Sequence, residues 1–275
     1  MKFKWGKMNA NMWGMVIFSA VFALVYKFSL WYAAQLGEVR SFVFGFERDI
    51  PFLPWTIIPY LSSGVFFCVV FLLIKSPEAL RVFLKRVLLM TVLAGIGFIL
   101  MPLQFSQPKP QVSHTILGAL FWLLDGVDDP YNQSPSLHVA FAFAFWTVFR
   151  ELKSPWRHIA AVWLMMVALS TLTTYQHHLI DVFTGSILAH VVFLIIPSQP
   201  RTFAYRNLHI ANFYFLAAWL VLLASFLMAE YFGTGWFNGC WLAVALFITG
   251  FLCQKYRIGQ LRREVIRISV FRRFL

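Results

Sequence analysis

Charged residues are scarce in this sequence: only 12% of its 275 residues are Asp, Glu, Lys or Arg. A soluble domain of this length carries about twice that fraction, so the scarcity argues against a soluble protein. In their place the chain is 60% hydrophobic, and apolar stretches of about 20 residues recur, each long enough to cross roughly 30 Å of hydrocarbon. The sequence therefore predicts an all-α, polytopic transmembrane helical bundle.

Acidic residues and cysteines are also few. The chain has 11 Asp and Glu against 23 Lys and Arg, which gives a formal net charge of +12. Because the basic residues lie between the apolar stretches, membrane topology explains them, and we expect membrane lipids rather than nucleic acid as partners. Cys68, Cys240 and Cys253 lie in or at the ends of apolar stretches. They show no pairing pattern and indicate no redox compartment.

Eight apolar segments are candidate membrane spans. Residues 1–200 contain the first six, residues 201–254 the last two, and residues 255–275 form a basic tail expected to contact the inner leaflet. We expect Pro135 in the first turn of the fourth span, with Ser134 or Ser136 as its N-cap. The candidate spans are residues 12–34, 53–74, 84–103, 136–150, 157–176, 179–197, 211–231 and 235–254.

The connections between the spans contain two amphipathic or apolar segments. The longest connection is 104–133, and its apolar part, 114–124, is too short to span the bilayer. We expect 114–124 to form a re-entrant or interfacial helix. The segment 38–50 mixes aromatic with charged residues and is expected to lie on the membrane interface.

The distribution of charge predicts the orientation. With the N-terminus inside, 19 of the 23 Lys and Arg residues fall on the cytoplasmic side, and eight of the eleven acidic residues fall outside. Positively charged loops remain on the cytoplasmic side of a membrane, so we expect both termini in the cytoplasm. His138, His177 and Asp181 then meet at the outer face of a plasma or inner membrane.

Two polar interruptions of the apolar sequence are candidates for function. One lies at 134–139 and the other at 170–182. Histidine, serine and aspartate are costly near hydrocarbon and mark functional sites by default. His177 and Asp181 are four residues apart, which predicts one face of a helix. His138 lies 39 residues before His177, so it meets this pair only if two hydrophobic helices lie side by side.

The two interruptions resemble the motifs of the type 2 phosphatidic acid phosphatase superfamily, the lipid phosphate phosphatases. Its Pro-Ser-Gly-His motif is matched by residues 135–138. Its second motif is Ser-Arg, five residues, His, three residues, Asp. The matching residues are Ser170, Thr171, His177 and Asp181.

Departures from these motifs indicate a branch of the superfamily. Leu137 replaces the Gly and Thr171 replaces the Arg, which is more similar to the branch of inositolphosphotransferases and sphingomyelin synthases. The upstream motif, Lys, six residues, Arg-Pro, is half present, with Lys109-Pro110 for Arg-Pro and Pro102 at the Lys position. Spans seven and eight lie outside the family's six-helix core.

The resemblance implies phosphoryl transfer from a lipid phosphate without a metal or other cofactor. His177 would attack phosphorus and form a phosphohistidine, Asp181 would hold the imidazole in the reactive tautomer, and His138 would protonate the leaving oxygen. A phosphatase is favoured and a lipid head-group phosphotransferase is the alternative. The candidate phosphate-binding residues are Ser136, Lys109, Ser170, Thr171 and Gln176, together with backbone N–H groups at the start of the fourth span.

The same residues also allow other functional interpretations. His178 is three residues from Asp181 and could be the nucleophile instead of His177. His177 and Asp181 could be a buried polar pair that joins helices, and His138, His177, His178 and Asp181 could ligate a metal ion. A transporter or scaffold with a buried polar site is the remote alternative in another functional class. His190, near the middle of its span, is expected in the core.

Overall fold

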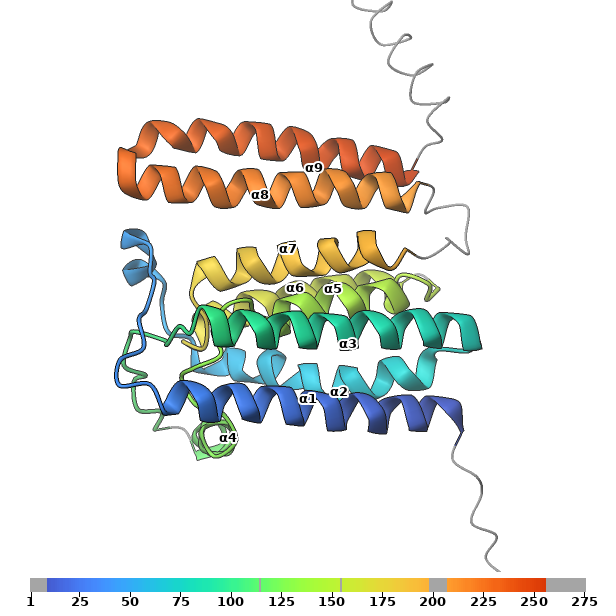
Figure 1. Ribbon diagram of the computed structural model, residues 1–275, viewed down its shortest axis with the longest axis horizontal. Helices are drawn as coiled ribbons and strands as arrows, with labels where there is room; N and C mark the ends of the chain where they lie inside the picture. The colour runs from blue at the N-terminus through green and yellow to red at the C-terminus, as the bar shows by residue number, and fades with distance from the viewer. Residues whose placement is uncertain (1–8, 114, 154, 198–206, 256–275) are drawn as a thin grey trace, which may run out of the picture. The chain divides into compact units, whose positions relative to one another are not determined.

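The regular structure is helical throughout the described part of the chain. The computed structural model describes residues 9–113, 115–153, 155–197 and 207–255 (Figure 1), so the predicted basic tail lies outside it apart from Lys255. Across these residues the only strand-like feature is an isolated bridge between Arg40 and Leu103. The all-α prediction is confirmed. The elements are α1 (Ala10–Ala34), η1 (Gly45–Asp49), η2 (Pro54–Thr56), α2 (Ile57–Leu73), α3 (Pro77–Leu100), α4 (Thr115–Asp125), α5 (Leu137–Phe149), α6 (Trp156–Thr173), α7 (Leu179–Ile195), α8 (Leu208–Phe232), η3 (Thr234–Asn238) and α9 (Gly239–Lys255).

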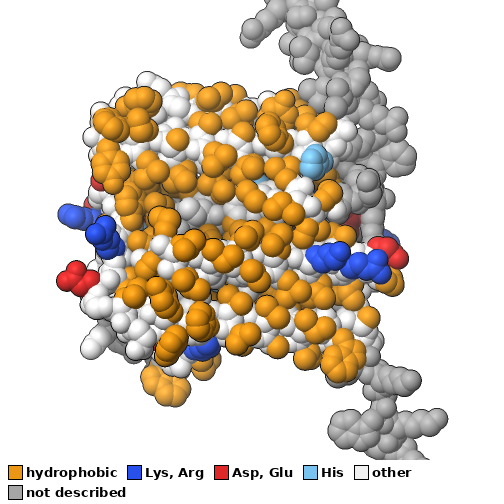
Figure 2. Space-filling view, in the orientation of Figure 1, with side chains coloured by type: hydrophobic (Ala, Val, Ile, Leu, Met, Phe, Trp, Pro, Cys, Tyr) orange, Lys and Arg blue, Asp and Glu red, His pale blue; other side chains and the backbone are white. Residues whose placement is uncertain are grey.

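A helix occupies each of the eight predicted spans. Six helical stretches in the described residues are long and apolar enough to cross a membrane, and they correspond to α1, η2 with α2, α3, α6, α8, and η3 with α9. Helices α5 and α7 have 13 and 17 residues and are shorter. Figure 2 shows hydrophobic side chains over most of the visible face and charged side chains mainly near helix ends. The chain is a multi-pass membrane protein.

The chain divides into two compact units, Met1–Ala189 and His190–Leu275. In the first unit α1 packs on α3 and α2, while α5 packs on α6, α2 and α3. These helices run side by side, and the connections from α1 to α2, from α3 to α5 and from α6 to α7 lie at one end of the unit (Figure 1). The candidate site residues lie at this end, which corresponds to the predicted outer side.

Helix α4 is the apolar segment of the longest connection. It runs across the direction of the neighbouring helices (Figure 1), as expected of an interfacial helix. Its Phe121 and Leu124 form a buried cluster with Ile57 and Tyr60 of α2. A helix is confirmed in this segment, and its contacts tie the loop to the start of α2.

Helix α5 begins one residue after a serine cap. Ser136 has an extended backbone, and its Oγ accepts from the Val139 N–H at 3.5 Å. The prediction that Pro135 lies in the first turn is wrong, because Ser136 is already the cap and Pro135 precedes it. The Ser136 N–H donates to the Asp181 carbonyl oxygen at 3.0 Å, which joins the starts of α5 and α7.

Gly185 allows α7 to approach α5 closely. A Cβ atom at this position would lie 2.5 Å from the Ser136 carbonyl oxygen and 3.2 Å from Val139 Cβ. No side chain fits in that space without moving the backbone. The absence of a side chain at Gly185 therefore helps to set how far apart the two helix starts lie.

The second unit contains a hairpin of α8 and α9 joined by η3. Ala211, Phe215 and Cys253 form its buried cluster. A Cβ atom at Gly250 would overlap the Phe215 ring, so the glycine lets the two helices pack closely. His190 is buried, and its Nδ1 lies 3.2 Å from Asn212 Oδ1, in agreement with its expected core position.

Candidate active site

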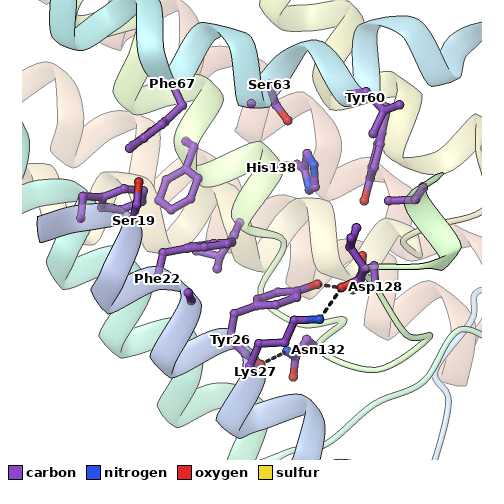
Figure 3. A pocket seen from close by; sticks show the side chains of 18 of the residues that line it. Ser19, Phe22, Tyr26, Lys27, Tyr60, Ser63, Phe67, Asp128, Asn132 and His138 are labelled. Atoms are coloured by element: carbon purple, nitrogen blue, oxygen red, sulfur yellow. Dashed lines mark hydrogen bonds between the residues drawn. The ribbon is translucent and has the colours of Figure 1, made fainter. Parts of the chain in front are cut away.

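A cavity of about 480 Å³ lies within the first unit, between α1, α2 and α5 (Figure 3). Its size is within the range of small-molecule sites. Most of its wall is apolar. The titratable side chains Tyr26, Lys27, Asp128 and His138 lie toward one side of the cavity, while Ser19 lies apart from them, close to Phe22 and Phe67 (Figure 3). The polar and titratable lining residues are Ser19, Tyr26, Lys27, Tyr60, Ser63, Asp128, Asn132, His138 and His177.

His138 lies in the first turn of α5 and faces this cavity. Its ring stacks on the buried Tyr60 ring, with centroids 4.1 Å apart and an interplanar angle of 24°. The ring centroids of His138 and His177 are 6.1 Å apart. The structure thus brings together two histidines that are far apart in the sequence, and Tyr60 fixes the plane of one of them.

His177 lies in the short connection between α6 and α7. Helix α6 ends at Thr173, and Tyr175 has a left-handed backbone with a φ of 56°. The Thr171 carbonyl oxygen then accepts from the Gln176 and His177 N–H groups at 3.1 and 3.0 Å. The prediction that His177 and Asp181 share one helical face is wrong in this respect, because α7 starts only at Leu179.

His177 and Asp181 are nevertheless adjacent. His177 Nδ1 lies 3.4 Å from Asp181 Oδ2, and both side chains are buried. The same Oδ2 accepts from the His178 N–H at 2.8 Å, which orients the carboxylate at the start of α7. Among the described residues, His177 Nδ1 and Asp181 Oδ1 have no hydrogen-bond partner. The two side chains are thus close but not joined by a hydrogen bond, as is common for catalytic pairs without substrate.

His178 faces a different cluster, with Glu47 at its centre. His178 Nδ1 lies 3.3 Å from Glu47 Oε2, and His178 Nε2 accepts from the Ser106 N–H at 3.2 Å. Because Nε2 accepts, the proton lies on Nδ1 and is donated to Glu47. The ring also stacks on Phe105, with centroids 4.4 Å apart. Both ring nitrogens of His178 are therefore engaged.

Glu47 joins two segments of the chain, 44–47 and 178–179. Its Oε1 accepts from the Phe44 N–H and its Oε2 from the Leu179 N–H, both at 2.9 Å. Glu47 and His178 are each 3% exposed, so this pair is almost fully desolvated. A buried pair of this kind fixes geometry, because removing one partner leaves the other uncompensated. Sequence reasoning missed Glu47, since it lies 131 residues from His178.

The predicted phosphate ligands lie in different surroundings. The Lys109 ammonium pairs with Asp125 at 3.0 Å on an exposed surface and does not line the cavity. The hydroxyls of Ser170 and Thr171 donate to backbone carbonyls of their own helix, at 2.7 Å each. The polar groups of these three side chains therefore already have partners within the protein.

Ser136 and Gln176 stay close in the chain to the two histidines. Ser136 is fully buried as the cap of α5 and precedes His138 by two residues. Gln176 directly precedes His177, and its buried Nε2 has no hydrogen-bond partner among the described residues. A buried amide donor without a partner is costly, which makes Gln176 a candidate donor for a ligand.

A cluster of polar residues on the α1 side of the cavity was not predicted from the sequence. The Tyr26 hydroxyl donates to Asp128 Oδ1 at 2.6 Å, and the Lys27 ammonium donates to the Val127 carbonyl oxygen at 2.6 Å. Asn132 donates to the Tyr26 carbonyl oxygen at 3.0 Å (Figure 3). The available signal was Tyr26 and Lys27 inside an apolar span, where polar groups tend to be functional.

Burial raises the pKa of the Asp128 carboxyl above its usual range. The hydrogen bond from Tyr26 and the charge of His177 act in the opposite direction. The effect of burial is larger than these two, because the charged carboxylate loses solvation, and the pKa of Asp128 is therefore raised. Asp128 is therefore electrostatically linked to the histidine side of the cavity.

The four side chains considered as metal ligands do not converge. No group of three His, Cys, Asp or Glu side chains that could hold a metal ion is found in the described residues. His178 instead contacts Glu47 and Ser106. The arrangement offers an imidazole beside a carboxylate and a second imidazole across a cavity, which is suited to nucleophilic and acid–base chemistry.

The comparison with protein families gives one match. Residues 83–205 match the family described as the PAP2 superfamily. This region begins within α3 and contains α4 to α7, and thus His138, His177 and Asp181. Neither a curated protein nor a solved structure matches the chain.

Proposed function

We propose that this chain, whose residues 83–205 match the PAP2 superfamily, is a membrane enzyme that removes the phosphoryl group of a lipid phosphate at the outer face of a plasma or inner membrane. One observation carries this proposal: His138 and His177 line one mainly apolar cavity, with Asp181 against His177. An apolar cavity with reactive groups in one part suits a substrate that has a hydrocarbon chain and a phosphate head.

In the first step His177 Nε2 attacks phosphorus, and the bond from phosphorus to the lipid oxygen breaks. Asp181 accepts a hydrogen bond from His177 Nδ1–H, which leaves Nε2 unprotonated and stabilises the imidazolium that forms. His138 gives its proton to the departing lipid alkoxide, so a neutral alcohol leaves. The product of this step is a phosphohistidine at His177.

In the second step water attacks the phosphohistidine. His138, now unprotonated, accepts a proton from the water, the bond from phosphorus to nitrogen breaks, and inorganic phosphate leaves. His177 and His138 thereby return to their starting protonation states. Gln176 and Ser136 are proposed to donate to phosphate oxygens, with Lys109, Ser170 and Thr171 as the weaker candidates because their polar atoms already have partners.

An alcohol in place of water would make the enzyme a lipid head-group phosphotransferase. Leu137 and Thr171, which replace the motif Gly and Arg, favour this second candidate function. The two reactions share the phosphohistidine and differ only in the acceptor of the second step. Mass spectrometry of the products distinguishes a free phosphate from a new phosphate ester.

The test is phosphate release by the purified full-length protein from a panel of lipid phosphates in detergent micelles. We expect release to continue with a chelator present and to be inhibited by orthovanadate, which mimics five-coordinate phosphorus. Release that stops with chelator and returns with added zinc would instead support a metal site. No phosphate release and no new ester from any lipid phosphate would reject the proposal.

A further inference from the structure

Asp128 is the acidic side chain that lines the cavity together with His138 and His177. It lies in the connection from α4 to α5, and the charge of His177 influences its pKa. Asp181 supports His177 from the helix side and does not line the cavity. The mechanism above uses Asp181 and has no step for Asp128.

The Asp128 carboxylate is held in place by two donors. Its Oδ1 accepts from the Tyr26 hydroxyl at 2.6 Å (Figure 3). The same oxygen accepts from the Asp129 N–H at 3.1 Å. Tyr26 in turn is linked through its carbonyl oxygen to the Asn132 amide. Such an oriented carboxylate presents acceptors to the cavity, since an ionised carboxylate has no donor.

A carboxylate near the reaction centre disfavours a phosphate unless another part of the ligand compensates it. Like charges at short range destabilise each other, and partial burial strengthens this effect. The cation predicted for phosphate binding, Lys109, is paired with Asp125, and Thr171 stands where the motif has Arg. Lys27 also lines the cavity, but its ammonium donates to the Val127 carbonyl oxygen, and among the described residues no ion pair joins Lys27 to Asp128. We therefore look for the compensating hydrogen-bond donor in the substrate.

We propose that Asp128 binds a hydroxyl or ammonium group that the lipid substrate carries close to its phosphate. This inference rests on the proposed function and names its substrate class: lipid phosphates with a hydroxyl or amine near the ester, rather than simple alkyl or fully esterified phosphates. Asp128 is then a specificity-determining residue, and Tyr26 is a positioning residue that acts through it.

The experiment compares four substrates that share one chain. They are dodecyl phosphate, its 2,3-dihydroxy and 2-amino derivatives, and its 2,3-dimethoxy derivative, which accepts but cannot donate hydrogen bonds. Values of kcat/KM for phosphate release are measured with the unmodified protein, Asp128→Asn, Tyr26→Phe and Asp129→Asn. Asp129 is the matched control, because it is the neighbouring aspartate and is exposed.

With the unmodified protein we expect the dihydroxy or the amino substrate to exceed both dodecyl phosphate and the dimethoxy substrate by about tenfold or more, as for a hydrogen bond to a charged group. Asp128→Asn should lose most of this preference, Tyr26→Phe part of it, and Asp129→Asn none. The unmodified protein tests the proposal by itself, even where Asp128→Asn fails to fold.

Two outcomes would overturn the inference. One is an unmodified protein that treats all four substrates alike. The other is an Asp128→Asn variant that keeps the full preference. Either result leaves the proposed function intact so long as phosphate is released. The proposed function fails separately if the unmodified protein hydrolyses none of the four, nor any lipid phosphate in the panel.

Discussion

His177 and His178 are neighbours in the sequence but lie in opposite surroundings. His177 lines the cavity and faces His138 and Asp181. His178 is enclosed by Glu47, Ser106 and Phe105, and both of its ring nitrogens are engaged. The difference shows that a histidine is available for chemistry when its ring faces a cavity, as His177 does. A neighbouring histidine with both ring nitrogens engaged, as in His178, can only stabilise the structure around the site.

The strongest test of this difference between His177 and His178 is to substitute each histidine separately. We expect His177→Ala to lower phosphate release by about 10⁴-fold or more on every substrate, as losses of a nucleophile do, and to leave no acid-labile phosphoprotein. His178→Gln should fold less stably yet still form the phosphoprotein. An active His177→Ala together with an inactive His178→Ala of normal stability would move the nucleophile by one residue.

A second prediction concerns His138, the partner of His177 across the cavity. A general acid matters most when the leaving oxygen is basic, as a lipid alkoxide is, and little for a nitrophenolate. We expect His138→Ala to lower kcat/KM by roughly 10²-fold or more on lipid phosphates and far less on nitrophenyl phosphate. Equal losses on the two substrate types would show that His138 binds phosphate or shapes the site instead.

A third prediction tests the surroundings of His178 through Glu47. In Glu47→Gln one of the two accepting oxygens becomes a donor that faces an N–H group, so a buried hydrogen bond is lost and a donor is left unmatched. We expect a loss of about 2–4 kcal/mol in the free energy of unfolding, seen as a lower Tm in detergent. The exposed Glu38→Gln is the control and should leave Tm unchanged. An unchanged Tm in Glu47→Gln would mean that the pair does not hold the site.

The smallest predicted effect concerns Asp128, the carboxylate that lines the cavity. Because the pKa of Asp128 is raised on folding, the folded protein binds this proton more tightly than the unfolded chain. The stabilisation is present below the usual Asp pKa and is lost as the pH rises through the raised pKa. Asp128→Asn has no such loss, so its Tm relative to the parent should increase slightly between acidic and neutral pH. A difference that is constant with pH, or equal in Asp129→Asn, would contradict this.

Local sequence patterns predicted the helices, because apolar stretches and helix caps depend on residues that are close together in the sequence. The spacing of His177 and Asp181 correctly predicted that they are close, although the helix begins later, because the Thr171 carbonyl and the backbone of Tyr175 end α6 first. The Ser136 cap was predictable for the same local reason.

Partners from distant segments could not be predicted in this way. The Tyr26–Asp128 bond and the Glu47–His178 pair join residues 102 and 131 positions apart, and no periodicity links such positions. Lys109 is the opposite case, in which a local pattern gave the wrong partner. Its position in the motif suggested that it binds phosphate, but its ammonium pairs with Asp125. Long-range pairing is decided by how the helices pack, and packing is not visible in a single sequence.

Gly185 connects helix packing to mutational tolerance. It has no group that can react or bind, yet any side chain there would overlap the Ser136 carbonyl oxygen and push apart the two helices that carry His138 and Asp181. In a saturation mutagenesis screen scored separately for expression and for activity, Gly185 should therefore behave like an active-site residue. Even alanine, the most conservative replacement by volume, should be found among the well-expressed but inactive variants.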